Sequence, residues 1–364
     1  MKSRWMILST TAGGLFLVAA VALMALTAAQ LEPIPDIRGH ALEATYPRVL
    51  SATGLPLTST YRNRWNVHDQ RPLTHIPDRI IDAFLAAEDR RFFHHNGVDW
   101  RARFHAIWQN LTAMRRVRGA STISEQVIKL HYPRPRGLWT RWLEGVEAKR
   151  LEQTVSKRDI LEFYLNQVPY AANRRGVVQA SRYYFDRSVD TLSLKEALAL
   201  AVMVRAPSAF DLRKYPGRID KRIHRLAEEM IRQGQLPPDS LTALTRPFEL
   251  KSPSLPLEAR HFARHVLRHS SHHDSTNSAL QTTINPSLQR LVQQSVDNHL
   301  HLLRSRNVRN AGALLVDLEN NAIVAWVVGG AKHTTTSGGD IDTVMTRRQP
   351  GSTLKPFVYA LALE

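Results

Sequence analysis

The sequence predicts a mainly α-helical chain that begins with one apolar helix and ends in a short α+β segment. Three observations support this fold class. The 27 residues from Trp5 to Leu31 carry no charge. Between residues 76 and 236, apolar residues recur every three or four positions, as they do along one face of a helix. After Asn277, short apolar runs separated by turn residues indicate strands.

The apolar segment at the N-terminus predicts a membrane anchor. As a helix rising ~1.5 Å per residue it would be ~40 Å long, enough to cross a ~30 Å hydrocarbon core. Lys2 and Arg4 precede it and Glu32 follows, so the positive-inside rule places the N-terminus in the cytoplasm and the rest of the chain outside. A cleaved signal peptide is the alternative, because residues 25–29 offer small side chains at a plausible cleavage site.

The composition is strongly basic and lacks cysteine. Lys and Arg number 49 against 32 acidic residues, for a net charge of +17, and this excess predicts an anionic partner. Behind a membrane anchor, anionic lipid head groups or a phosphorylated substrate fit this charge better than nucleic acid does. The absence of Cys excludes disulfides and thiolate metal sites.

The remaining segments follow in order. Residues 32–75, rich in Pro, Arg and Thr, are interpreted as a membrane-proximal connector, with a short hairpin expected around residues 49–57. Residues 76–236 form the helical domain, in which Ser193 and Glu196 are spaced as a capping box. Residues 237–276 read as a linker, including a solvated histidine-rich stretch, and residues 277–364 begin an α+β domain with a hairpin around residues 313–328.

One stretch in the helical domain concentrates chemical groups. Residues 88–97, EDRRFFHHNG, end an amphipathic helical run and bring Glu88 and Asp89 beside aromatic rings. A carboxylate beside apolar rings is suited to act as a general base, since desolvation moves its pKa towards the working range. A solvated acidic pair that closes a helix is the alternative interpretation of these ten residues.

This stretch resembles the first signature of the peptidoglycan glycosyltransferases, the lysozyme-like polymerase module of class A penicillin-binding proteins. Glu88, Asp89, Phe92, His95 and Gly97 meet that signature. Four further segments resemble the family in the family's order: Gly119–Gln126 with Lys129, Thr140–Glu144, Lys157 to Asn166, and Arg222 with Leu226. Thr140 and Leu130 depart from the usual residues, at positions near the expected diphosphate site.

The resemblance implies a glycosyl transfer on lipid II. It implies that Glu88 deprotonates the 4-hydroxyl of the acceptor N-acetylglucosamine. Lys129 and Arg141 would stabilise the departing diphosphate, because preorganised charge lowers the barrier. Glu144 would orient a cation or hold a divalent metal ion, Mg or Mn. The expected substrate-binding residues are Asp89, Phe92, His95, Ser121, Thr122, Gln126, Lys129 and Arg141.

A second motif lies near the end of the sequence. Ser352 and Lys355 resemble the Ser-x-x-Lys nucleophile segment of penicillin-binding transpeptidases, and this spacing puts both side chains on one helical face. Only nine residues follow Lys355, too few for the Ser-x-Asn and Lys-Thr-Gly elements of that family. We therefore expect an incomplete, inactive transpeptidase fragment.

Together these features predict a single-pass protein of the inner membrane whose catalytic domain is periplasmic. Its expected partners are lipid II, the nascent glycan strand, the membrane and proteins of cell-wall synthesis. Two alternatives stay open. A lytic muramidase would also be lysozyme-like, although the cations argue against it, since a hydrolase has no anionic leaving group. An inactive scaffold of cell-wall assembly is the non-enzymatic alternative.

Overall fold

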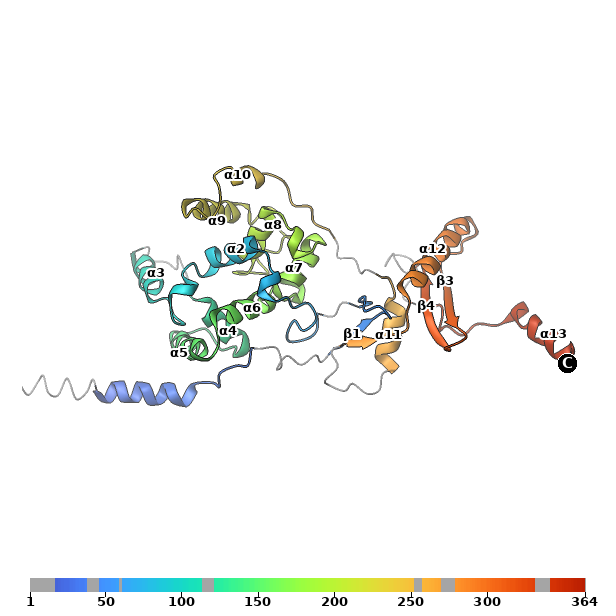
Figure 1. Cartoon of the computed structure of the whole chain (residues 1–364), viewed down its shortest axis with the longest axis horizontal. Coiled ribbons are helices and arrows are strands. Elements are labelled where there is room, and N and C mark those ends of the chain that lie inside the picture. The colour runs from blue at the N-terminus through green and yellow to red at the C-terminus, as the bar shows by residue number, and fades with distance from the viewer. Residues whose placement is uncertain are drawn as a thin grey trace, which may run out of the picture. The chain divides into compact units, whose positions relative to one another are not determined.

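The structure is a computed structural model that describes residues 17–37, 46–58, 61–112, 121–251, 257–269, 279–330 and 341–363. The chain divides into two compact units (Figure 1). Unit 1 comprises Met1–Glu43 and Arg64–Pro253, and unit 2 comprises Ala44–Asn63 and Ser254–Glu364. Part of the predicted connector, residues 44–63, thus belongs to unit 2.

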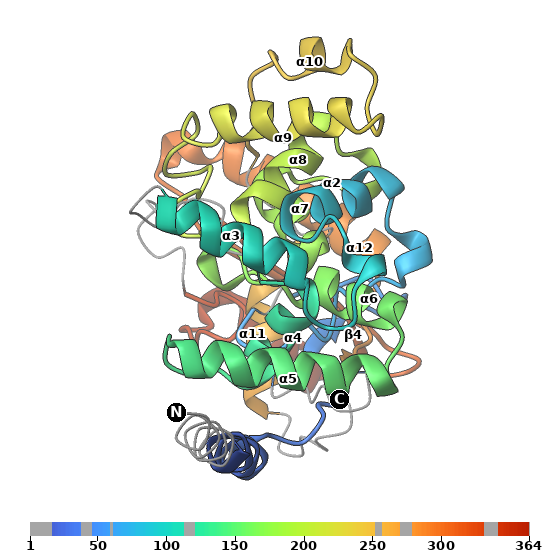
Figure 2. The same cartoon turned by 90° about the vertical axis from the view of Figure 1, so that its left-hand side faces the viewer.

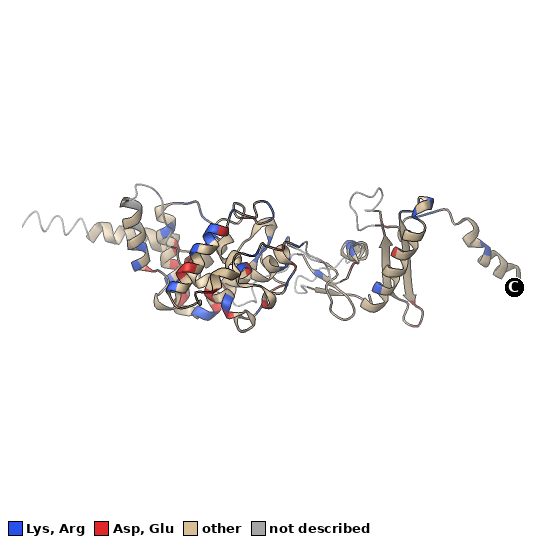
Figure 3. Cartoon of the chain, turned by 90° about the horizontal axis from the view of Figure 1, so that it is seen from above, with Lys and Arg blue, Asp and Glu red and all other residues tan. Residues whose placement is uncertain are grey.

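The elements of unit 1 are all helices within its described residues, as the apolar periodicity predicts. After a helix over residues 17–30, its elements are η1 (Leu73–His75), α2 (Asp78–Glu88), η2 (Phe92–His94), α3 (Trp100–Thr112), α4 (Ile123–His131), α5 (Leu138–Thr154), α6 (Lys157–Gln167), η3 (Ala171–Asn173), α7 (Gly176–Phe185), η4 (Val189–Thr191), α8 (Leu194–Met203), α9 (Asp220–Arg232) and α10 (Ser240–Ala243). Basic and acidic residues are interspersed along these helices (Figure 3).

Helix α8 is the centre of unit 1. Every residue from Lys195 to Met203 is buried, and α2, α7 and α9 pack around the helix (Figure 1). The predicted capping box is confirmed, because the Ser193 hydroxyl accepts from the Glu196 amide while the Glu196 carboxylate accepts from the Ser193 amide. A helix that is apolar all round is stable in water only when other helices enclose it, as they do here.

The N-terminal helix is described over residues 17–30. The predicted span Trp5–Leu31 also includes residues 5–16, which lie outside the described residues. Among the helices within the described ranges, none is long and apolar enough to cross a bilayer.

Unit 2 is an α+β arrangement. β1 (Arg48–Leu50) pairs in parallel with β2 (Ala279–Gln281), and β3 (Ala311–Asp317) pairs antiparallel with β4 (Ala322–Gly329), which confirms the predicted hairpin. Its other elements are α11 (Arg260–His269), α12 (Pro286–Leu302), η5 (Arg304–Arg306), η6 (Gly351–Leu354) and α13 (Lys355–Leu363). The buried core of unit 2 draws on Val49, Leu57, Phe262, Ile284 and Trp326.

The prediction of a solvated histidine-rich stretch is wrong for its first part. Residues 260–269 form α11, which buries His261, Phe262 and Ala263. The His265 ring lies 5.0 Å from the Trp326 ring and 4.2 Å from the His269 ring. The apolar positions of this helix are few, and their burial depends on a strand more than fifty residues later in the sequence.

Candidate active site

Glu88 is the last residue of α2, where the helix ends at the edge of the core. Ile80, Ala83, Phe84 and Ala87 are buried, and the backbone leaves helical geometry at Asp89. The Glu88 side chain is 9% exposed. This position keeps the carboxylate largely shielded from water yet accessible from one side.

Two donors fix the Glu88 carboxylate. Gln126 Nε2 donates to Oε2 at 3.0 Å, and Arg205 Nε donates to Oε1 at 2.9 Å. The Tyr164 hydroxyl in turn donates to Gln126 Oε1 at 3.1 Å. Burial, followed by the charge of Glu88, raises the pKa of Tyr164 well above its usual value, so the phenol is a neutral donor. The predicted Gln126 and Glu88 are therefore brought together.

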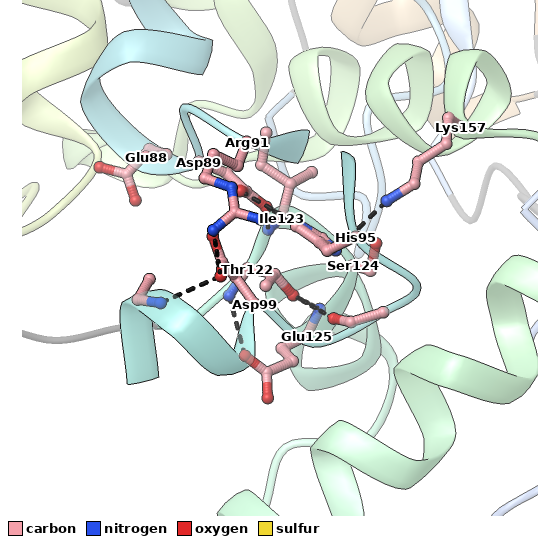
Figure 4. A network of polar contacts seen from close by, with 12 residues as sticks. Glu88, Asp89, Arg91, His95, Asp99, Thr122, Ile123, Ser124, Glu125 and Lys157 are labelled. Atoms are coloured by element: carbon pink, nitrogen blue, oxygen red, sulfur yellow. Dashed lines mark hydrogen bonds and ion pairs between the residues drawn. The ribbon is translucent and has the colours of Figure 1, made fainter. Parts of the chain in front are cut away.

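Asp89 and His95 are buried and contact each other. His95 Nε2 lies 3.0 Å from Asp89 Oδ2, and the Ile123 backbone N–H donates to the same oxygen at 2.9 Å (Figure 4). His95 Nδ1 lies 3.4 Å from Lys157 Nζ, which also donates to Glu152 at 2.7 Å. These contacts connect the first signature to the start of α4. Asp89 and His95 therefore hold the two segments together from the interior of the unit.

Phe92 is buried beneath this network. Its ring lies 4.4 Å from Lys157 Nζ and packs edge-on against Phe93. Phe92 thus contacts the cation that reaches His95. In this structure its role is packing.

The start of α4 carries the residues of the second signature. Thr122 forms a capping box with Glu125, and its hydroxyl also donates to the Gly97 carbonyl at 2.6 Å. Gly97 has φ +80°, and a Cβ atom there would lie 2.5 Å from the Lys149 backbone nitrogen on α5. The signature glycine is therefore required by both backbone geometry and close packing. Of the second signature, Gly119 and Ala120 lie outside the described residues.

A pocket of about 330 Å³ opens at Glu88. It is bounded by the end of α2, the first turns of α3 and the approach to α4. Its polar lining residues are Glu88, Asp89, Arg90, Arg91, Asp99, Arg101, His105, Ser121, Thr122 and Arg205. The predicted residues Glu88, Asp89, Ser121 and Thr122 thus share one pocket.

Glu144, Lys129 and Arg141 form a second group that does not line this pocket. Glu144 is buried on α5, and burial raises the pKa of its carboxyl, while the charges of Lys129, Arg134 and Arg141 act in the opposite direction. Lys129 and Arg141 are exposed. Within the described part of the chain, neither side chain makes a hydrogen bond or ion pair, so both cations are available to an anionic ligand.

A metal ion has little support from the protein side chains. The described residues contain no group of three or more His, Asp or Glu that could hold one. Glu144 stands among cations, which disfavour a further positive charge. The donor set at Glu144 does not fit a protein-bound metal.

The sequence reasoning missed Arg205. It follows the end of α8, separated from Glu88 by more than a hundred residues, and it belongs to none of the motifs discussed above. Its guanidinium also donates to the Ala87 carbonyl, so it braces the last turn of α2. An Arg just before Ala206-Pro207 is the only sequence signal, and it does not indicate a partner.

Ser352 and Lys355 lie in unit 2, at the junction of η6 and α13. Both residues are exposed. Among the described residues, no hydrogen bond involves the Ser352 hydroxyl or the Lys355 ammonium.

Comparison with known proteins identifies one domain of this chain. Residues 54–231 match the family model described as Transglycosylase. This confirms the resemblance seen in the motifs: the chain carries a transglycosylase domain of the kind found in class A penicillin-binding proteins.

The chain is similar to penicillin-binding protein 1C of Escherichia coli strain K12, at 32% identity over 79% of this chain and 37% of that protein. It is also similar to penicillin-binding protein 1A of Aquifex aeolicus, at 36% identity over 48% of this chain and 24% of that protein. The chain thus spans well under half of either relative. A crystal structure of penicillin-binding protein 1A from Haemophilus influenzae aligns with 75% of this chain and 32% of its own at a TM-score of 0.36 and 19% identity.

Proposed function

We propose that unit 1 is a peptidoglycan glycosyltransferase with a lysozyme-like fold. It polymerises lipid II into glycan strands by inverting transfer and releases polyprenyl diphosphate. The observation that carries this proposal is the position of Glu88: a shielded carboxylate at the end of α2, held by Gln126 and Arg205, facing a pocket inside a transglycosylase domain.

Glu88 acts as the general base. A carboxylate oxygen can accept two hydrogen bonds, so Oε1 and Oε2 each keep a site for an incoming hydroxyl while Arg205 and Gln126 stay bound. The acceptor hydroxyl would enter through the pocket, with Ser121 and Thr122 at its wall. Proton transfer to a carboxylate already oriented for it avoids reorganisation at the moment of reaction.

The cations Lys129 and Arg141 take the diphosphate leaving group. They are exposed, and Glu144 lies near enough for their charges to act on its carboxyl. Two carboxylates, one at each group of residues, with a nucleophile between them are the arrangement of inverting glycosidases. Here the nucleophile would be a sugar hydroxyl in place of water.

The proposed location of the chain in the cell rests on its N-terminal segment. Residues 5–31 would anchor the chain in the inner membrane, with unit 1 in the periplasm beside lipid II, the growing strand and other proteins of cell-wall synthesis. The apolar side chains Leu17, Val18 and Met24 are exposed on the helix 17–30, which supports contact with lipid. Nucleic acid is not an expected partner of a domain in this location.

A divalent cation stays a prediction that the mechanism does not require. With one carboxylate from the protein, an ion at Glu144 would depend on oxygens of the diphosphate itself. Activity that is lost in EDTA and restored by Mg²⁺ would support it. If Glu144→Gln also loses activity in EDTA and regains it with Mg²⁺, the ion binds at a site other than Glu144.

The deciding experiment supplies labelled lipid II to the detergent-solubilised chain and follows glycan chain formation. Glu88→Gln is expected to lower the rate by about 10²–10⁴-fold, as for loss of a general base. Glu249→Gln, which changes a carboxylate that is 70% exposed, should match the wild type. Equal rates for wild type and Glu88→Gln would exclude Glu88 as the base. Cleavage of preformed glycan would favour the muramidase alternative, and absence of any turnover would favour the scaffold.

A further inference from the structure

The helix 17–30 is attached to α5 by polar contacts. Thr27 is its only buried residue among positions 17–30. Trp142 Nε1 donates to the Thr27 hydroxyl at 3.0 Å, and Trp139 Nε1 donates to Gln30 Oε1 at 2.7 Å. In Figure 2 this helix lies directly below α5.

The Thr27 hydroxyl both accepts and donates a hydrogen bond. It accepts from Trp142 and donates to the Leu23 carbonyl at 2.7 Å, so its orientation is determined from both sides. The helix therefore meets α5 in one rotational setting. A purely apolar contact would allow the helix to turn, whereas two indole N–H groups one helical turn apart do not.

The chain after the helix continues along the same surface. The Glu32 amide donates to Glu147 Oε1 at 2.9 Å, and Arg150 donates to the Glu32 carbonyl at 3.3 Å. Two guanidinium nitrogens of Arg134 hold Glu147 at 2.7 Å each. From Thr27 to Glu32 the polypeptide is thus bound to α5 by four hydrogen bonds.

Trp139 and Trp142 indicate where the boundary between lipid and water lies along unit 1. The exposed apolar side chains of the helix end at Leu26, and polar residues begin at Thr27 and Gln30. Trp side chains favour the boundary between lipid and water. Arg141 lies between Trp139 and Trp142 in the same turn of α5, within ~4.5 Å of axial rise. A lipid-linked diphosphate has its charged group at this same boundary.

We propose that Trp139 and Trp142, through Gln30 and Thr27, are positioning residues that fix Arg141 at the height of the lipid head groups. This proposal rests on the proposed function, since it assumes an anchored enzyme acting on a lipid-linked diphosphate. We call the hydrogen bonds from Trp139 to Gln30 and from Trp142 to Thr27 the latch. Breaking the latch should weaken capture of the lipid substrate from the bilayer, whereas Arg141 still contacts the diphosphate once the substrate is bound, so the chemical step keeps its rate.

The test uses the full chain in vesicles of phosphatidylcholine and phosphatidylglycerol. Thr27→Val, which keeps shape and loses the hydroxyl, and Trp142→Phe, which loses the N–H, should each raise KM for lipid II about 3- to 10-fold at unchanged kcat. The double variant should equal the single ones, because both remove the same hydrogen bond. Thr27→Ser and Trp108→Phe, an exposed indole on α3, should match the wild type.

Detergent micelles provide the decisive comparison because they offer no fixed plane. There the KM difference should vanish. An equal difference in micelles, a wild-type KM for Thr27→Val in vesicles, or a fall in kcat would each overturn the proposal.

A chemical cross-link separates this proposal from the proposed function. The chain has no cysteine, so Thr27→Cys with Trp142→Cys creates a unique pair. A short bis-maleimide should join the pair in vesicles and should not join Thr27→Cys with Phe104→Cys. If the wild type polymerises nothing, the function fails and the cross-link still reports the latch. If the pair does not cross-link, the latch is wrong whatever the activity.

Discussion

At the scale of single residues, Glu144 shows how a buried carboxylate can lower the stability of the folded protein. It is buried on α5 without a hydrogen bond among the described residues, and burial raises the pKa of its carboxyl. An acid with a raised pKa is disfavoured in its ionised form by the folded protein, so the folded state carries a penalty at neutral pH. Residues with a catalytic role often lower the free energy of unfolding in this way.

Glu144→Gln is therefore expected to raise the thermal unfolding temperature at neutral pH. The gain should shrink as the pH falls through the raised pKa towards the ordinary value of 4.5, because the wild-type carboxyl is then protonated too. Calorimetry at several pH values checks this, with Glu249→Gln as the exposed control. A gain that is independent of pH would mean that charge burial is not its cause.

Individual site residues could be predicted where they lie close in sequence. Glu88, Asp89 and His95 fall within one turn and loop, and Thr122 follows its own capping pattern. Arg205 could not be predicted, because its contact with Glu88 depends on α8 packing against α2. The burial of Asp89 and His95 could not be predicted either, because the motif gives residue types but does not show which side chains contact each other.

At the scale of elements, α4 and α8 offer a matched pair of capping boxes. Thr122 begins α4 at the pocket, and Ser193 begins α8 in the core. Replacing either with Ala should cost about 1 kcal/mol for the cap. Thr122→Ala also loses the hydrogen bond to the Gly97 carbonyl, which adds about 0.5–1.5 kcal/mol.

The activity of these two variants should differ more than their stability. Thr122→Ala loosens the wall of the pocket and should slow glycan synthesis, whereas Ser193→Ala should keep the wild-type rate at a temperature where both remain folded. Denaturant unfolding and the lipid II assay measure the two effects. Equal loss of activity in both variants would show that Thr122 contributes through stability alone.

Helices with strong periodicity and caps, such as α6 and α8, could be predicted from the sequence. α11 could not, because its burial of His261 and Phe262 depends on unit 2. Local patterns reveal an amphipathic helix only when its apolar face is wide. For β1, the predicted hairpin around residues 49–57 is confirmed, since Leu50 bridges Pro56 and the Leu57 N–H donates to the Val49 carbonyl at 2.8 Å. Its parallel pairing with β2 could not be predicted, because the partner lies far along the chain.

At the scale of the whole molecule, the net charge of +17 predicts salt-sensitive capture of the anionic substrate. Screening shortens from about 10 Å at 0.1 M salt to about 3 Å at 1 M. Binding of lipid II should therefore weaken as salt rises, and less steeply in Lys129→Ala and Arg141→Ala. Lys221→Ala on α9 is the control. Identical salt slopes in all four proteins would argue against a charge clamp at Lys129 and Arg141.

We expect that penicillin does not acylate unit 2. Ser352 and Lys355 are exposed, and among the described residues no hydrogen bond fixes either side chain. A catalytic nucleophile and its base must be held in contact with each other. A fluorescent penicillin should leave no covalent label on this chain. A labelled band that disappears in Ser352→Ala would contradict this expectation.

The parallel pairing of β1 with β2 has a consequence for biogenesis. Residues 51–278 intervene between the partners, and the larger part of unit 1, Arg64–Pro253, lies within this interval. Joining two ends of so long a loop carries a large entropic cost while the loop is unfolded. Once the ribosome has released the Arg64–Pro253 part of unit 1 and this part has folded, the loop is effectively shorter. β1 therefore stays unpaired until β2 emerges.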